Sequence, residues 1–290
     1  MDQTNLLKDG IMLLMQKYIT LEKKVGETPL SCTEAYRSEH PELLGVSMAY
    51  AGRLDPMASG RLLVLLGDEC KHQEKYHGLD KEYEFSILFG IESDSLDVLG
   101  RLNTCTDKDS DSSKTSGETM KEKISLVIQD LAGNIELPYP RFSAKTVQGK
   151  PLHTWTMEGR LHEIEIPTKA STIHSINLIK TEILTRAEIA KQARIKIDTI
   201  PPVTELRKAL GNDFRRVDVR ADWENIANDA SLPDTYTIAK FSCLASSGTY
   251  MRTLASVIAS KIDSCGLAWS IHRTKIGVYD NKQQSWTTEY

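Results

Sequence analysis

The sequence predicts a soluble globular protein whose strands and helices follow one another in mixed order, a pattern compatible with the α+β class. The chain has 290 residues, of which 40% are hydrophobic and 26% charged, so a sizeable core is expected. This length allows one large domain or two ordinary ones. Residues 82–89 have the period of two of a strand, and residues 251–262 carry the apolar stripe of a helix.

Apolar runs in the first third of the chain predict strands. Residues 10–15 (GIMLLM) are a plausible buried strand. Residues 62–66 (LLVLL) are either a strand or a buried helical turn, because periodicity does not separate the two in so short a run. Residues 82–89 give the clearest strand. The residues that share one face of it are Tyr83, Phe85, Ile87 and Phe89.

The middle of the chain is expected to contain two loops and one helix. Residues 104–122 are rich in Ser, Thr and Asp, which predicts a solvated loop. A helix is expected at residues 121–131. In residues 138–155 the prolines and a glycine exclude a regular helix, and the aromatic and basic side chains are typical of a binding cleft.

The last third predicts helices, a strand and a helix. Residues 187–230 are expected to be helical around two adjacent prolines, and residues 237–245 alternate as one strand face. A short loop then opens the helix at 251–262. Arg252 lies in its first turn, where the helix dipole disfavours a cation by ~0.3–1 kcal/mol. Judged from the helix alone, Arg252 is a solvated side chain; the alternative is an anionic partner beside it.

Composition and charge limit the classes of function. No apolar run approaches the ~18 residues of a membrane span, and no signal peptide is evident, so a cytoplasmic protein is expected. The net charge of −4 argues mildly against a nucleic-acid binder. However, residues 141–160 and 180–220 are locally basic, which fits either a surface for a phosphate backbone or solvated faces balanced elsewhere. Five scattered cysteines and seven scattered histidines predict neither a disulfide framework nor a metal site.

The segment GRLDPMASG, residues 52–60, holds an aspartate between two glycines. Pro56 forces the backbone of Asp55 out of the helical region, and Gly52 and Gly60 allow sharp turns. Local rules favour Asp55 as the N-cap of a helix with proline at its first position. An oriented, ionised carboxylate is also what an enzyme nucleophile must be.

Four segments together resemble one enzyme family. Residues 50–67 (YAGRLDPMASGRLLVLLG) are similar to the catalytic motif of TruB-type tRNA pseudouridine-55 synthases. Residues 80–100, with a K-x-Y strand and an S-D-x-x-D turn, residues 140–155 and residues 246–262, with G-T-Y-M-R-T, resemble the family's later motifs in the same order. Residues 10–17 match more weakly. The motifs span most of the chain, which makes the resemblance specific.

The resemblance implies an α+β pseudouridine synthase fold, with a mixed, largely antiparallel sheet, flanking helices and a central catalytic cleft. It implies a single catalytic domain over residues 1–290, without the C-terminal PUA domain of many relatives. A polar loop at 104–122 and a helical insertion at 187–232 are expected within it. The expected reaction isomerises a T-loop uridine, at tRNA position 55, and needs neither metal nor cofactor. The expected partner is the T arm of tRNA, bound by a monomer.

Site residues are carried over position by position. The resemblance implies that Asp55 is the nucleophile, that Tyr83 stacks on the target base and that Arg252 pairs with Asp55. An adjacent guanidinium favours the ionised carboxylate against desolvation. The further substrate-binding candidates are Tyr250, Tyr50, Arg53 and Lys145.

The chain departs from the family in several places. Tyr50 stands where the family usually has a histidine, so contacts to the flipped base are expected to differ. No role is assigned to Lys17. The basic helices around 186–220 are expected to supply an electropositive rim for RNA, with Arg215 and Arg216 as residues that test it.

Two other classes of function remain open at this point. One is a non-catalytic RNA-binding or tRNA-folding protein on the same scaffold, although a pure binder has no use for a buried Asp–Arg pair that costs desolvation energy. The other is a hydrolase with an aspartate nucleophile, which would need a second carboxylate or a histidine to activate water.

Overall fold

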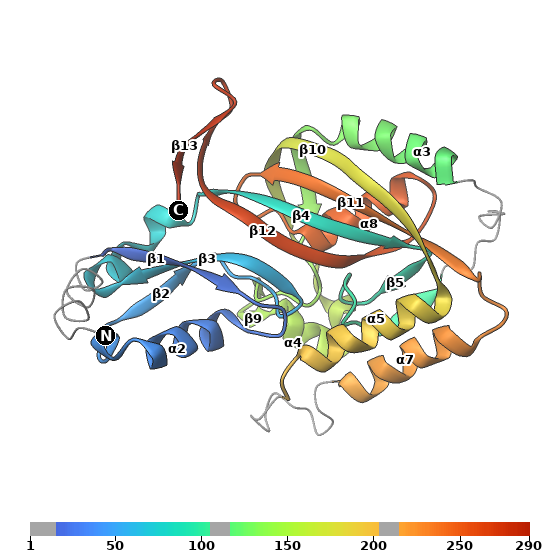
Figure 1. Cartoon of the computed structure of the whole chain (residues 1–290), viewed down its shortest axis with the longest axis horizontal. Helices are drawn as coiled ribbons and strands as arrows, with labels where there is room; N and C mark the ends of the chain where they lie inside the picture. Colours follow the sequence, from blue (N-terminus) through green and yellow to red (C-terminus); the bar gives the residue numbers. More distant parts are fainter. Residues whose placement is uncertain (1–15, 105–116, 203–214) are drawn as a thin grey trace, which may run out of the picture.

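A computed structural model describes residues 16–104, 117–202 and 215–290 of the chain, and its centre is a nine-stranded sheet (Figure 1). Its strands are β1 (Tyr18–Lys23), β2 (Met48–Ala51), β3 (Ala58–Leu66), β4 (Asp80–Phe89), β7 (Gly133–Pro138), β10 (Thr168–Thr185), β11 (Thr235–Ala245), β12 (Gly266–Asp280) and β13 (Ser285–Glu289). Two small ladders lie outside it, β5 (Ile91–Ser93) with β6 (Leu102–Thr104) and β8 (Thr146–Val147) with β9 (Lys150–Pro151).

The strand order is β1-β3-β12-β4-β11-β10-β7, with β2 beside β3 and β13 beside β12. Every neighbouring pair is antiparallel except β12 and β3, which are parallel. The expected mixed, largely antiparallel sheet is therefore confirmed. The short run 62–66, left open between strand and helix, lies in β3.

Helices flank the sheet. They are α2 (Pro29–Glu39), α3 (Gly117–Asp130), α4 (Leu152–Met157), α5 (Arg186–Thr199), α7 (Arg216–Asn228) and α8 (Met251–Lys261), with short 3₁₀ segments at Pro41–Leu43, Gly67–Tyr76 and Leu161–Glu163. The chain starts α5 with a capping box, in which Thr185 and Glu188 satisfy each other's free backbone N–H groups. The helices expected at 187–230 are confirmed where the structure describes them, and α5 and α7 lie side by side (Figure 1).

The main core lies between helix α8 and the central strands of the sheet, and includes residues of β4, β11 and β12. The rings of Phe85 and Phe241, on adjacent strands, stack with centroids 5.2 Å apart. Leu254 and Ile258 of α8 are fully buried, and burying each side chain is worth about 1.5–3 kcal/mol. α8 packs on β12 and β4. This packing fixes the start of α8, and with it Arg252, against the sheet.

Three local expectations need correction or fall outside the described residues. Residues 117–122, expected in the polar loop, belong to α3 because the buried Ile124 and Ile128 on its inner face supply packing that local composition does not reveal. Residues 152–155, expected to be irregular, start the short α4, which buries Leu152 and Trp155. Residues 10–15 and 105–116 lie outside the described residues.

Two further observations concern the cysteines and membranes. Cys265 forms a disulfide, which the scattered spacing did not predict, whereas Cys32, Cys70 and Cys243 are free thiols. Within the described parts of the chain, no helix is both long and apolar enough to cross a membrane.

Candidate active site

Asp55 lies on the short loop between β2 and β3. The Ala58 N–H donates to the Asp55 carbonyl oxygen at 2.9 Å, which closes a four-residue turn with Pro56 at its second position. Asp55 is therefore not a helix cap, because the chain enters β3 directly and pairs there with β1 and β12. Gly60 is required for this path: its φ is +106°, and an added Cβ would lie 2.2 Å from the Arg273 carbonyl oxygen.

Arg252 is the counter-ion of Asp55. Its Nε lies 2.8 Å from Asp55 Oδ2, and its side chain is only 4% exposed, against 39% for Asp55. The interpretation of Arg252 as a solvated side chain is therefore wrong. The Nε–H is not aligned with an acceptor, so this is a close charge contact rather than a linear hydrogen bond. Arg252 Nη1 donates to the Ser95 carbonyl at 2.9 Å and Nη2 to the Phe142 carbonyl at 3.2 Å.

A second carboxylate, that of Asp97, lies at this guanidinium. The sequence did not lead us to assign it a role. Its Oδ2 lies 3.7 Å from Arg252 Nε, and its side chain is 6% exposed. Burial raises the pKa of Asp97, and the charge of Arg252 opposes that shift. Asp97 also accepts from the Ser95 hydroxyl at 2.6 Å and the Leu99 N–H at 3.0 Å. It is the second acid of the S-D-x-x-D turn, which was the available signal.

Tyr83 of β4 faces the same region. It is 9% exposed and lies opposite Arg273 in the β4–β12 ladder. Burial raises the pKa of its phenol, while the charge of Arg273 opposes that shift. The phenol is therefore neutral near pH 7. Arg273 is itself buried, and its Nε donates to the Arg61 carbonyl at 2.6 Å.

Two buried lysines complete the surroundings of the loop that carries Asp55. Lys23, at the end of β1, donates through Nζ to the Ala58 carbonyl at 2.5 Å. The charge of Asp55 favours the protonated form of Lys23 and so opposes the effect of burial. Lys81, at the start of β4, donates to the Leu79 carbonyl. Burial lowers the pKa of each to about 8. Neither was predicted. Lys17, to which no role was assigned, is exposed just before β1.

The substrate-binding candidates divide into two groups. Tyr250, half-buried at the N-cap of α8, packs edge-on against Tyr139 with ring centroids 5.6 Å apart. The exposed Lys145 lies over the Tyr139 ring at 5.1 Å. The exposed Arg53 lies on the Asp55 loop, where its charge opposes the rise that burial causes in the pKa of the Tyr250 phenol. Tyr50 instead packs on a separate hydrophobic cluster formed by β1, α2 and β3.

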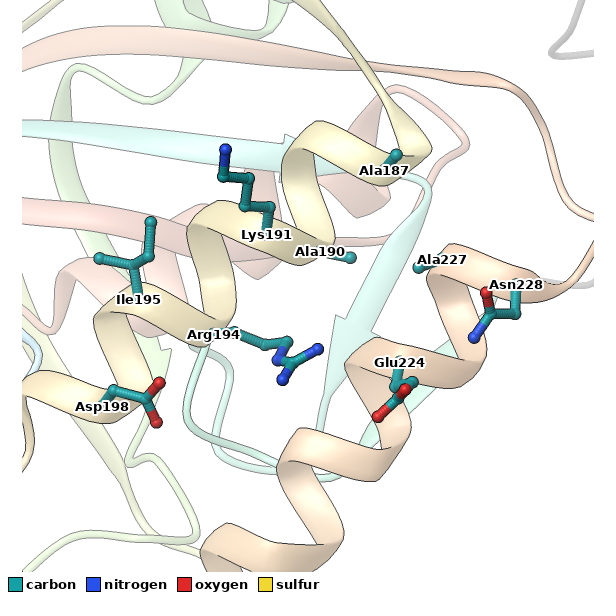
Figure 2. A pocket seen from close by; sticks show the side chains of 9 residues that line it. All are labelled: Ala187, Ala190, Lys191, Arg194, Ile195, Asp198, Glu224, Ala227 and Asn228. Atoms are coloured by element: carbon teal, nitrogen blue, oxygen red, sulfur yellow. The ribbon is translucent and has the colours of Figure 1, made fainter.

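A pocket of about 380 Å³ lies elsewhere, between α5 and α7 (Figure 2). None of the predicted site residues lines it, and Arg194 extends from α5 into the space facing α7. Among the residues that the structure describes, no group of three or more His, Cys, Asp or Glu could hold a metal ion.

Comparison with known proteins decides the family. The family model described as "TruB family pseudouridylate synthase (N terminal domain)" matches residues 43–199, more than half of the chain and the part that contains Asp55. The chain belongs to the TruB family. It is 26% identical over 268 residues to a tRNA pseudouridine synthase B of Caldicellulosiruptor saccharolyticus, covering 92% of this chain and 70% of the relative.

Other relatives extend the comparison. Identity is 28% over 232 residues to a tRNA pseudouridine synthase B of Borreliella afzelii, covering 80% of this chain and 60% of the relative. A solved structure, described as a crystal structure of a Cbf5-Nop10-Gar1 complex, is similar with a TM-score of 0.50 and 15% identity, over 92% of this chain and 51% of that chain. This likeness shows the fold. The chain thus spans only part of the length of the proteins it matches.

Proposed function

We propose that this TruB-family protein is a tRNA pseudouridine synthase that isomerises the T-loop uridine at tRNA position 55, with Asp55 as the nucleophile. The observation that carries the proposal is the contact of 2.8 Å between Asp55 and the buried Arg252. The relatives are named tRNA pseudouridine synthase B, which supports the substrate class.

The unequal exposure of the pair suits this role. Asp55 is partly exposed and can meet a substrate, while Arg252 is enclosed and keeps its partner oriented. The carboxylate is the nucleophilic form of an aspartate, and the guanidinium at 2.8 Å fixes the orientation of its oxygens. The two carbonyl groups that accept from Arg252 hold the guanidinium in place.

The reaction balances without another reactant. A carboxylate oxygen of Asp55 forms a bond to the ribose C1′ or to the uracil ring, and the N1–C1′ bond breaks. The detached uracil turns, C5 bonds to C1′, and the carboxylate leaves. The C5 proton is removed and N1 gains one, so the step is an isomerisation with no net oxidation or hydrolysis.

Tyr83 would support the detached base. An aromatic platform next to the nucleophile is what a base taken out of its stack needs. Because its phenol is neutral, Tyr83 would stack on the base and donate a hydrogen bond, and it would not act as a phenolate general base. Tyr250, Tyr139 and Lys145 then form the adjoining wall. Lys145 is exposed and lies over the Tyr139 ring, so its charge would be available to an RNA phosphate beside a stacked base.

The test uses a T-arm transcript labelled with tritium at C5 of the target uridine, because only isomerisation releases that hydrogen to water. The wild type should release tritium, and Asp55→Asn should release none while binding the transcript within about twofold. A transcript with cytidine at the target position is the substrate control. A wild type that binds but releases nothing would identify a non-catalytic RNA-binding protein. Activity in Asp55→Asn would exclude Asp55 as nucleophile.

A further inference from the structure

Arg215 was expected to be a surface cation available to RNA, but its side chain makes inward contacts and is mostly enclosed. Its Nη2 lies 2.5 Å from Asp94 Oδ2, and its side chain is 17% exposed. Its guanidinium also lies over the Phe142 ring, 4.7 Å from the centroid. Arg215 adopts a φ of +69° at the N-cap of α7, a conformation that residues other than glycine seldom hold unless their surroundings impose it.

Arg215 contacts the same two segments that supply the hydrogen-bond acceptors of Arg252. Asp94 immediately precedes Ser95, whose carbonyl accepts from Arg252 Nη1. Phe142 supplies the other acceptor, for Arg252 Nη2. These segments come from the β5–β6 turn and from the loop after β7, which are distant in sequence. Arg215 therefore connects the two segments whose carbonyl groups hold the Arg252 guanidinium.

We propose that Arg215 is a positioning residue, which clamps Asp94 and Phe142 together so that their neighbouring carbonyls orient Arg252 toward Asp55. This inference rests on the proposed function. The geometry needs an arginine, because its planar guanidinium can pair with a carboxylate through one edge while its face covers an aromatic ring. A lysine keeps the charge contact with Asp94 but lacks the planar face.

The chain offers a matched control. Arg101 also ties α7 to the β5–β6 turn, through Asp222 at 2.6 Å and Asp218 at 3.4 Å. Its side chain makes no described contact with Phe142, so it holds the same helix without joining the two supports. Arg101→Gln therefore removes an ion pair between the same two elements, a more exposed one than that of Arg215, without opening the clamp.

The kinetic experiment compares Arg215→Gln, Arg215→Lys and Arg101→Gln on the T-arm transcript. Arg215→Gln should lower kcat by about ten- to a hundredfold with KM within about twofold, since misplacement of a catalytic group by ~1 Å costs that much. Arg215→Lys should recover part of the loss, and Arg101→Gln should stay within about twofold of wild type. A rise in KM alone would make Arg215 an RNA contact. An equal loss of kcat in Arg101→Gln would overturn the clamp.

A second readout does not depend on turnover. The Nε–H signal of Arg252, assigned in an NMR spectrum by its loss in Arg252→Lys, should shift and exchange faster with solvent in Arg215→Gln but not in Arg101→Gln. An unchanged signal in a folded Arg215→Gln protein would overturn the inference. If the wild type forms no pseudouridine, the proposed function fails, and this measurement still decides whether Arg215 positions Arg252.

Discussion

Replacing Arg252 by methionine should show that Asp97, more than Asp55, depends on the guanidinium for stability. The side chain of Asp97 is 6% exposed and that of Asp55 39%. Removing one partner of a buried ion pair costs about 3–5 kcal/mol, because the remaining charge stays buried. Arg252→Met should therefore lose about that much free energy of unfolding near pH 7.

The second substitution identifies which carboxylate carries this cost. Arg252→Met with Asp97→Asn should recover about 2 kcal/mol of the loss, because the buried uncompensated charge is gone. Arg252→Met with Asp55→Asn should recover less than about 0.5 kcal/mol, because water already reaches that carboxylate. The two double variants differ only in which partner of Arg252 is neutralised, so each serves as the control for the other.

The pH dependence has a definite sign. Burial already raises the pKa of Asp97, and loss of the opposing Arg252 charge raises it further. A carboxyl group whose pKa is higher in the folded state destabilises that state fully above the folded pKa, and the penalty disappears below the unfolded value of about 4. The gap between wild type and Arg252→Met should therefore narrow as the pH falls from 7.5 towards 5.

Equilibrium unfolding in urea at pH 7.5 and 5.5 measures all four proteins. Equal rescue by the two double variants, or a gap that does not change with pH, would refute the assignment of the buried charge to Asp97.

Three further predictions concern other parts of the chain. Gly60→Ala should lower the free energy of unfolding, measured by heat or urea, by more than about 2 kcal/mol, because its Cβ would meet the Arg273 backbone at 2.2 Å. Gly67 is also at positive φ but has nothing within 4 Å, so Gly67→Ala should lose about 1 kcal/mol. Equal losses in the two variants would contradict this reasoning. Burial lowers the pKa of Lys196 to about 7, so its charge destabilises the folded state fully below pH 7 and not above about 10.5. The free energy of unfolding of Lys196→Met relative to wild type should accordingly fall between pH 7 and 10, by about 1.4 kcal/mol per pH unit at most. A difference that stays constant over this range would exclude the titration. Tyr139→Ala should weaken T-arm binding by about tenfold through lost stacking while leaving kcat unchanged, and a fall in kcat alone would assign Tyr139 to the reaction instead.

Much of the secondary structure follows from sequence alone. Residues 82–89 alternate with the period of a strand, and residues 251–262 carry a helical stripe, because both patterns depend only on local backbone geometry. The shape of the Asp55 loop is also partly local, since Pro56 restricts the backbone and the two flanking glycines free it wherever they occur. Asp55, Tyr83 and Arg252 were selected by resemblance, and the contact between Asp55 and Arg252 is confirmed.

Tertiary structure decided what these groups do to one another. Local rules made Asp55 a helix cap, but pairing of β3 with β1 and β12 converts the same residues into a turn that enters a strand. The burial of Arg252 and Asp97, and the inward contacts of Arg215, depend on elements far apart in the chain. Charge and composition look the same for a solvated and an enclosed side chain. Only the packing of the sheet and helices sets the distances and the solvent exclusion that separate a surface cation from a buried counter-ion.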